Sequence, residues 1–410
     1  MNQRTVLISG ASVAGPVLAY WLRRHGIVPT VVERTSRPRL ATGGHAVDIF
    51  GAAVEVVDRM GLLDQVQAAR TGTTTMRLRR TGRAGVDIPI EALVAGMSQG
   101  GHVELMRGEL ARILHQAVSD DVEHIFGDEI TALHDDGSGV DVTFAAAPPR
   151  RFDLVVGADG LHSGVRRLTF GPEERFAHHL GGYLAAASYT DPGLEPGVLH
   201  AYNSAGRVAV TYPVWQSRQA RATFIFRAGA DQAPHHRDLD GQRRFLRGAF
   251  ASSGDELTAL VATAEDAEDF YLDAITQIRM DTWSKGRVTL VGDAAYSPGP
   301  ALGAGTSLAP VGAYLLAHHL ADSAEHTTAF SRYEHEMADV VRTARQMGPS
   351  MMRSVVPASA LQARAIVPAA KALTVLPAWL RRRVLSGINR PLQALGRARL
   401  PELRSHEGRP

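Results

Sequence analysis

The sequence contains no cysteine in its 410 residues. This absence excludes disulfide bridges, thiolate nucleophiles, cysteine-ligated zinc and iron–sulfur clusters, and it is typical of a protein in a reducing compartment. Long apolar runs are also missing, since no window of about 18 uncharged apolar residues resembles a membrane span. The N-terminal residues enter a predicted strand without the charged and apolar segments of a leader peptide. We therefore expect a cytoplasmic protein.

An excess of charge of one sign is absent as well. The formal net charge is +2, so the composition favours no nucleic-acid partner. Three adjacent histidine pairs lack matching carboxylates, and their side chains would point apart, so we expect no metal site. The pairs are His178-His179, His235-His236 and His318-His319. No Gly-x-Ser-x-Gly elbow of a hydrolase occurs.

The first 33 residues predict a strand, a glycine-containing turn, a helix and a second strand. The turn Gly10-Ala-Ser-Val-Ala-Gly15 resembles a dinucleotide fingerprint in which Ser12 replaces the middle glycine. In this arrangement a pyrophosphate lies on free N–H groups at the helix N-terminus. Glu33 ends the second strand, where an acidic side chain contacts the ribose of an adenosine. The unit therefore predicts dinucleotide binding.

Along the rest of the chain the predicted secondary structure changes several times. Helices are expected at about 52–60 and 107–119, and a buried strand ends in the turn Gly157-Ala-Asp-Gly160. Between about 176 and 280, short alternating segments predict an antiparallel sheet with one covered face. From about 328 onward we expect helices broken by prolines, namely Pro349, Pro357, Pro368 and Pro377.

The stretch GDAAYSPGPALGAG, from Gly292 to Gly305, connects a predicted buried strand to a predicted apolar helix. It has few large side chains but keeps one carboxylate, Asp293. Because glycines let a ligand approach the backbone closely, this loop predicts a binding surface for something other than protein.

Three stretches are similar to motifs of the class A flavoprotein monooxygenases, the family of para-hydroxybenzoate hydroxylase and the tetracycline-inactivating monooxygenases. They are the Gly10 turn, Asp153-Leu-Val-Val-Gly-Ala-Asp-Gly160 and the Gly292 loop, in the family's order, and the resemblance covers roughly residues 5–345. It implies an α/β fold: a Rossmann-like FAD-binding domain, an inserted antiparallel β-sheet substrate domain and C-terminal helices. The expected boundaries are 1–72, 101–175 and 280–345 for the FAD domain, 73–100 and 176–279 for the substrate domain, and 346–410 for the helical segment.

The resemblance also implies roles for individual residues. Asp293 would bond a ribityl hydroxyl, and Asp159 with Gly160 would line the pyrophosphate and the approach of the nicotinamide. Pro300 and the residues from Gly303 to Ser307 would lie along the isoalloxazine ring. The whole set expected to contact FAD is Gly10, Ser12, Val13, Ala14, Gly15, Glu33, Arg34, Gly44, His45, Arg107, Ile130, Asp159, Gly160, Gly292, Asp293, Pro300, Gly303, Ala304, Gly305, Thr306 and Ser307.

His45 is the one candidate for a catalytic side chain, since it could face the flavin ring. It could equally be a loop histidine in solvent. The chain departs from the family at Tyr296, where many members have histidine, and at Pro310, which should shift or kink the first turns of its helix.

The residues that contact the substrate are harder to predict from the sequence than those that contact FAD. A phenolic or polycyclic substrate, such as a polyketide-type metabolite or an antibiotic, would suit the aromatic residues of the middle sheet. The candidates are His200, Tyr202, Arg207, Tyr212 and Phe224. Each could instead belong to the core or the surface, because such sheets are often rich in aromatic side chains.

By resemblance we expect an FAD-dependent aromatic hydroxylase that acts through a flavin C4a-hydroperoxide, with NADPH or NADH as reductant and O2 as co-substrate. Alternatives of the same fold are a Baeyer–Villiger oxygenase, an oxidase, a halogenase or a reductase. A flavin-binding protein without turnover is a further alternative. A dehydrogenase that uses only nicotinamide would explain the Gly10 turn but not the Gly292 loop. The chain is expected to be a monomer or a homodimer.

The C-terminal segment from Lys371 is basic and interleaved with leucine, valine and Trp379. Such a segment could form an amphipathic helix on an anionic membrane surface. It could also be a helix that packs across the two lobes with its charges in solvent. We expect the second arrangement, and therefore no membrane contact.

Overall fold

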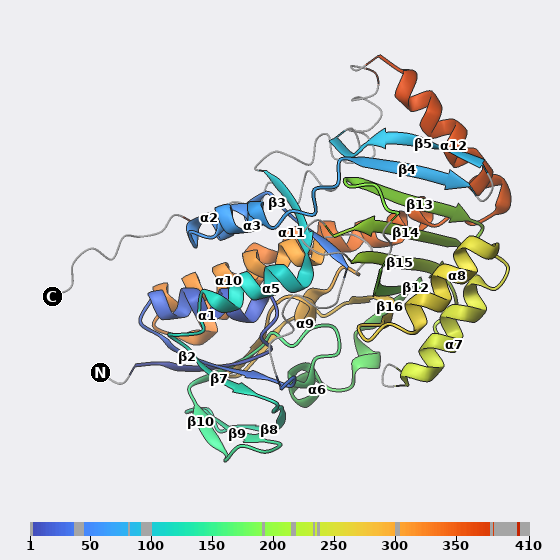
Figure 1. The fold of residues 1–410 in the computed structure, drawn as a ribbon. Coiled ribbons are helices and arrows are strands. Elements are labelled where there is room, and N and C mark those ends of the chain that lie inside the picture. Colours follow the sequence, from blue (N-terminus) through green and yellow to red (C-terminus); the bar gives the residue numbers. More distant parts are fainter. Residues whose placement is uncertain are drawn as a thin grey trace.

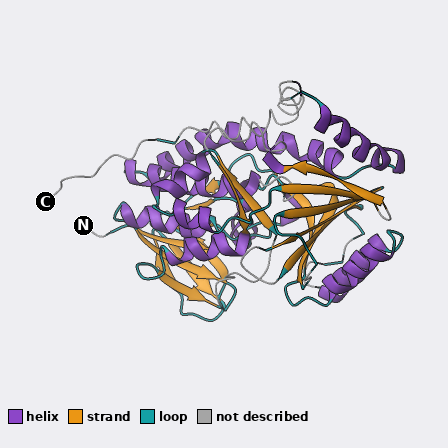
Figure 2. Ribbon diagram, turned by 45° about the horizontal axis from the view of Figure 1, so that its top comes forward, coloured by secondary structure: helices purple, strands orange, loops and turns teal. Residues whose placement is uncertain are grey.

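The computed structural model describes residues 3–36, 45–80, 83–91, 101–190, 193–214, 219–232, 234–235, 238–299, 304–377, 380 and 400–401. These residues form two lobes that lie side by side (Figure 1). Figure 2 shows the strands of the two lobes as separate groups, with most helices over the first lobe.

The first lobe is built on a mainly parallel sheet. Its strand order is β17-β18-β11-β1-β2-β7, and only β17 is antiparallel to its neighbour. Val6, Leu7 and Ile8 in the centre are fully buried, as expected when helices cover both faces. The strands are β1 (Thr5–Ser9), β2 (Val28–Glu33), β7 (Glu123–Phe126), β11 (Leu154–Gly157), β17 (Ser284–Lys285) and β18 (Val288–Leu290).

Helices cover this sheet, and α1 packs closely on α10 (Figure 1). Pro310 lies inside α10. The helices of this lobe are α1 (Ala14–Arg24), α2 (Ala52–Arg59), α3 (Leu63–Ala68), α5 (Arg107–Gln116), α6 (Gly164–Phe170), the 3-10 turn η1 (Glu173–Arg175), α9 (Asp293–Tyr296) and α10 (Ala304–Asp322).

Two small antiparallel sheets complete the first lobe, and neither follows from the sequence patterns above. One has the order β10-β9-β8, and the other pairs β3 with β6. Their strands are β3 (Ala46–Phe50), β6 (His102–Met106), β8 (Ile130–Asp135), β9 (Val140–Phe144) and β10 (Arg150–Phe152).

The second lobe is a seven-stranded sheet with the order β16-β12-β15-β14-β13-β4-β5. All its pairs are antiparallel except β13 with β4, so the expected antiparallel sheet is confirmed with one parallel exception. The strands are β4 (Thr75–Arg80), β5 (Arg83–Pro89), β12 (Ala177–Tyr189), β13 (Val198–Ser204), β14 (Arg207–Pro213), β15 (Ala220–Arg227) and β16 (Tyr271–Ile278).

The two faces of this sheet are covered differently. Phe224 and Phe226 point to the face that α7 (Leu239–Phe250) and α8 (Asp255–Glu265) cover, where they pack on Phe250 and Leu257. The sequence patterns above did not predict these helices. The opposite face, with Leu184, packs against the end of α11 (His326–Val355).

The C-terminal helices run through some prolines expected to break them. α11 continues for 30 residues through Pro349, and α12 (Ala360–Val375) continues through Pro368. The prediction was therefore wrong at these two prolines, while Pro357 lies in the break between the helices. Pro349 has no N–H to donate to the Arg345 carbonyl, and Gln277 Nε2 donates to that carbonyl instead, at 2.7 Å.

No helix in the described ranges is long and apolar enough to cross a bilayer. Most of the basic tail from Arg381 onward lies outside the described residues. Pro401 is described, and its carbonyl oxygen accepts from Tyr314 Oη at 3.0 Å, so this point of the tail lies on α10. The domain boundaries stay a prediction.

Candidate cofactor-binding site

The turn between β1 and α1 excludes side chains at two positions. Gly10 has a φ of +108°, and a Cβ there would clash with the carbonyl oxygen of Ala158. A Cβ on Gly15 would clash with the carbonyl oxygen of Gly10, so α1 starts directly against the turn. No side chain caps α1 at Val13. Its first N–H groups are therefore available to an anion, and the helix dipole favours that anion.

Glu33 lies beside this turn, as the fingerprint predicts. Its Oε2 accepts from the N–H of Ala11 at 2.9 Å, and its Oε1 accepts from the N–H of Thr35 at 2.9 Å. The carboxylate is thus oriented at the end of β2, where a ribose hydroxyl can reach it. Arg34 is exposed next to it.

Arg107 reaches the same turn from a distant part of the chain. It is the first residue of α5, its N–H donates to the His45 carbonyl at 3.3 Å, and its Nη2 donates to Ser12 Oγ at 3.3 Å. A cation at a helix N-terminus is electrostatically unfavourable. An anion between Arg107 and the start of α1 would relieve that repulsion, and a pyrophosphate has the charge and length to do so.

Asp293 occupies the other end of this site. It follows Gly292, whose φ is +69°, and heads the short helix α9. Burial raises the pKa of the Asp293 carboxyl, while the positive charge of Arg107 acts in the opposite direction. The Ser297 side chain supplies one hydrogen bond to this carboxylate. The hydroxyls of a ribityl chain would supply donors to its remaining lone pairs. The residues present therefore fit FAD.

The start of α10 lies beside Asp293. A Cβ on Gly305 would stand 3.1 Å from Asp293 Oδ1, so the first turn of the helix is held close to the carboxylate. Ser307 Oγ accepts from the N–H of Phe50 at 3.2 Å and donates to the Asp48 carbonyl at 3.1 Å. Ser307 thus joins α10 to β3. Ala304 and Thr306 lie in the same turn, whereas Pro300 and Gly303 lie outside the described residues.

Asp159 has partners of its own. Its carboxylate accepts from Ser163 Oγ, from the N–H of Val165 at 3.1 Å and from Ser9 Oγ at 3.4 Å, so it joins β1 to the N-terminus of α6. Burial raises the pKa of Asp159. Gly160 has a φ of +81°, and a Cβ added there would meet nothing within 4 Å. Direct contact of these two residues with FAD stays a prediction.

His45 stands just before β3, and its carbonyl holds Arg107. Burial and the charge of Arg107 lower the pKa of His45 to about 4, so its imidazole is neutral at pH 7. Of the other expected contacts, Gly44 lies outside the described residues, and Ile130 is buried at the start of β8.

The structure separates the expected substrate residues onto two faces of the large sheet. Tyr202 and Phe224 pack under α7 and α8, and Tyr202 Oη donates to Glu256 Oε1 at 2.8 Å. Arg207 is on this face too, where its Nη1 donates to Ser252 Oγ at 3.0 Å, and His200 lies 3.2 Å from Arg79. These four side chains are not brought together with the cofactor residues.

Tyr212 points to the other face, toward the first lobe. Its Oη accepts from the N–H of Ala46 at 2.8 Å, next to His45, and its ring packs with Met106. Burial raises the pKa of Tyr212, so its hydroxyl is protonated at neutral pH. It is the one expected substrate residue that the structure places beside the cofactor residues.

Tyr271 is a candidate site residue that the sequence patterns above did not predict. It lies on the same face as Tyr212, packed with Leu184 and Ile275, and its Oη donates to Asp273 Oδ2 at 3.1 Å. The charges of Arg107 and Asp293 both act on its hydroxyl. Tyr271 and Asp273 are two residues apart, so in a strand their side chains lie on the same face. The sequence does not say which face of the sheet that is, because this depends on the strands that pair with theirs.

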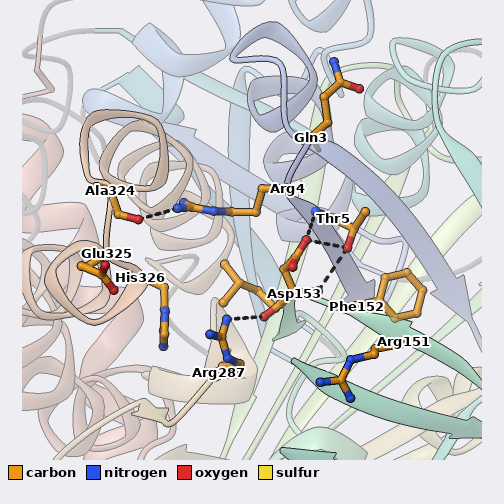
Figure 3. A pocket seen from close by; sticks show the side chains of 11 residues that line it. Gln3, Arg4, Thr5, Arg151, Phe152, Asp153, Arg287, Ala324, Glu325 and His326 are labelled. Atoms are coloured by element: carbon orange, nitrogen blue, oxygen red, sulfur yellow. Dashed lines mark hydrogen bonds between the residues drawn. The ribbon is translucent and has the colours of Figure 1, made fainter. Parts of the chain in front are cut away.

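A cavity of about 640 Å³ lies elsewhere, at the N-terminal ends of β1 and β11 (Figure 3). Arg4 and Arg287 line it, but Arg4 donates to the Ala324 carbonyl at 2.7 Å and Arg287 to the Asp153 carbonyl at 3.2 Å. The Gly10 turn is at the opposite end of β1. This cavity is therefore separate from the candidate cofactor site.

The fold and the site together define a dinucleotide-binding α/β protein with a second, sheet-based lobe over the site. The family model for the FAD binding domain matches residues 3–347. The chain therefore belongs to this family, the class A flavoprotein monooxygenases, which confirms the resemblance and the expected fold class.

Individual relatives extend over most of the chain. A flavin-dependent monooxygenase of Legionella longbeachae is 36% identical over 84% of this chain and 87% of its own length. An uncharacterized protein of Mycobacterium tuberculosis is 41% identical over 81% of this chain and 89% of its own. The crystal structure of tetracycline destructase Tet(55) superposes with a TM-score of 0.82 at 32% identity, over 98% of this chain and 99% of that one.

Proposed function

We propose that this protein uses FAD, O2 and NADPH or NADH to hydroxylate an aromatic or polycyclic small molecule. The observation that carries the proposal is the site in which Arg107, Asp293 and the Gly10 turn converge, beneath the sheet face that bears Tyr212 and Tyr271. The likeness to tetracycline destructase Tet(55) over 98% of the chain supports a polycyclic substrate.

The chain's own residues bind and orient. The N–H groups at the start of α1 and the Arg107 guanidinium would hold the pyrophosphate. Glu33 would accept a hydrogen bond from a ribose hydroxyl, and Asp293 would accept one from a ribityl hydroxyl. When bound, the flavin supplies the activation of oxygen. The large sheet, which places Tyr212 beside His45, would limit the access of water to the flavin.

Tyr212, Tyr271 and His45 are the polar groups proposed to meet the substrate. Tyr212 keeps its proton and can donate a hydrogen bond. Tyr271 also keeps its proton, which it donates to Asp273, so its hydroxyl oxygen can accept a hydrogen bond from the substrate. The neutral imidazole of His45 can accept a proton or a hydrogen bond at pH 7. A flat, phenolic molecule between the two lobes would use both properties.

The test is turnover by the FAD-loaded protein with 18O2. Purified protein should bind FAD, and candidate polycyclic phenols should stimulate NADPH or NADH oxidation and gain one labelled oxygen atom on a ring carbon. Label inserted as a lactone oxygen would indicate a Baeyer–Villiger outcome. Oxidised substrate without label would indicate an oxidase, and a failure to bind FAD would contradict the proposed function altogether.

The proposal also includes the cellular location and the oligomeric state of the protein. The lack of cysteine supports a cytoplasmic location. We propose a monomer or a homodimer, which sedimentation of the FAD-loaded protein would distinguish.

A further inference from the structure

Two arginines and a histidine lie close to one another, near the loop that follows Asp293. Arg279 comes just after β16, His178 lies on β12, and Arg345 lies on α11. Burial and the positive charges of Arg279 and Arg345 lower the pKa of His178, and the charge of Arg279 also contributes to a lowered pKa of Arg345. Gln277 links the three residues geometrically: it is the register partner of His178, its Oε1 accepts from Arg279, and its Nε2 donates to the Arg345 carbonyl.

Arg345 has hydrogen-bond donors without acceptors. Its Nε and Nη2 are both buried, and neither has a partner in the described part of the chain. In Arg166, Arg221 and Arg243 the same is true of Nε alone. A buried donor without a partner destabilises the folded state, because it loses its hydrogen bond to water and gains none in return. Two such atoms on one guanidinium indicate a site that an external acceptor completes.

Carboxylates do not supply that acceptor. Among the described residues, neither Arg279 nor Arg345 forms an ion pair within 4.0 Å. Asp281 is near enough to raise the pKa of Arg345, which only reduces the shift caused by burial and Arg279. Arg279 donates from Nε and Nη2 to Gln277 Oε1, at 3.1 and 2.8 Å, which leaves its charge unneutralised.

Gln277 connects this cluster to the loop of the proposed flavin site. The residue is fully buried, and its Nε2 donates to the Pro298 carbonyl at 3.1 Å and to the Arg345 carbonyl at 2.7 Å. A Cβ on Gly348 would clash with this Nε2, so α11 packs directly on the amide. An anion held by the arginines would thus stiffen the backbone at Pro298.

We propose that Arg279, Arg345 and His178 form a binding site for a phosphate dianion. A guanidinium fork matches the oxygens of phosphate, and two of them give more donors than a carboxylate accepts. The phosphate has two possible sources: the 2′-phosphate of NADPH, an assignment that rests on the proposed function, or free inorganic phosphate, which does not.

The first experiment measures inorganic phosphate binding to the FAD-loaded protein by calorimetry at constant ionic strength. We expect Arg345→Met to weaken binding at least about tenfold, which corresponds to 1.4 kcal/mol. The matched control is Arg342→Met, because Arg342 lies on the same helix, is exposed and pairs with Asp339 at 2.8 Å. Equal binding by the wild type and Arg345→Met would overturn the proposal.

Steady-state kinetics then distinguish the sources. If the site takes the 2′-phosphate of NADPH, Arg345→Met raises the KM for NADPH about tenfold and leaves that for NADH unchanged. If it takes free phosphate, both KM values stay unchanged although phosphate binding is lost. Should Arg345→Met fail to fold, Arg279→Met serves instead, because Arg279 is exposed. Binding of phosphate requires no turnover, so it can succeed or fail independently of the proposed function.

Discussion

His162 Nε2 and Asp273 Oδ2 are hydrogen-bonded at 2.9 Å across the boundary between the two lobes. On its other side, His162 Nδ1 is 2.9 Å from Glu173 Oε1. Asp273 also accepts from Tyr271, so the histidine from the first lobe orients a carboxylate that holds a proposed substrate residue of the second. The pair joins the turn after Gly160 to β16.

The charge of His162 makes the stability of the protein depend on pH. Burial alone would lower its pKa, but hydrogen bonds to Asp273 and Glu173 raise it to about 10, above the ordinary value of 6.5. A raised pKa means that the stabilisation is fully present below pH 6.5 and is lost as the pH rises through 10. In thermal unfolding, the wild type should exceed His162→Gln in Tm at pH 6, and the difference should shrink toward pH 10. His335→Gln, an exposed position on α11, serves as the control with no such trend. A difference that stays constant with pH would contradict this account.

Gly15 should tolerate no side chain. The Cβ of Gly15→Ala would clash with the carbonyl of Gly10, so α1 would move away from the turn. We expect about 1–3 kcal/mol of destabilisation and loss of bound FAD, measured by denaturant unfolding and by flavin absorbance. In the control, Gly248→Ala, the new Cβ meets nothing within 4 Å inside α7, so a gain of about 0.5–1 kcal/mol is expected. Full retention of FAD by Gly15→Ala would be inconsistent with the proposed position of the pyrophosphate.

Arg107 should contribute to FAD affinity through charge. Replacing it by methionine keeps the aliphatic stem and removes the group that donates to Ser12. We expect Arg107→Met to raise the Kd for FAD at least about tenfold, with a weaker dependence of the Kd on salt. Arg112→Met changes the same helix but breaks only contacts within that helix, to Glu109 and Gln116, so its Kd should match the wild type. Fluorescence titration of the apoprotein with FAD measures both, and equal Kd values for the two variants would argue against the assignment.

Tyr212 and Tyr202 test which face of the large sheet meets the substrate. Tyr212→Phe leaves the N–H of Ala46 without its acceptor and should disturb the His45 segment, at a cost of about 1–3 kcal/mol in stability. We expect the KM for the aromatic substrate to rise about tenfold. Tyr202→Phe loses its bond to Glu256 on the opposite face and should leave the KM unchanged. The reverse result would place the substrate under α7 and α8.

Several parts of the fold could be predicted because their causes are local. The turn of β1 into α1 needs glycine at Gly10 and Gly15, and Glu33 follows at the end of the next strand, so one short segment carries the whole signal. The alternation in β13, β14 and β15 similarly predicts strands with two unlike faces. The prolines at 349 and 368 show the limit, since packing of α11 and α12 overrode a local preference.

The sequence by itself determined the cofactor motif and the class of fold, because the backbone conformation of a turn and the side-chain period of a strand depend on residues that are close together in the chain. The tertiary structure alone decided which side chains meet. Tyr212 and Tyr202 look equivalent along the chain, yet the helices α7 and α8, inserted between β15 and β16, cover one and leave the other facing Ala46. The pairing of His162 with Asp273 likewise joins residues 111 positions apart. Such contacts depend on how whole elements pack, and local patterns do not encode that packing.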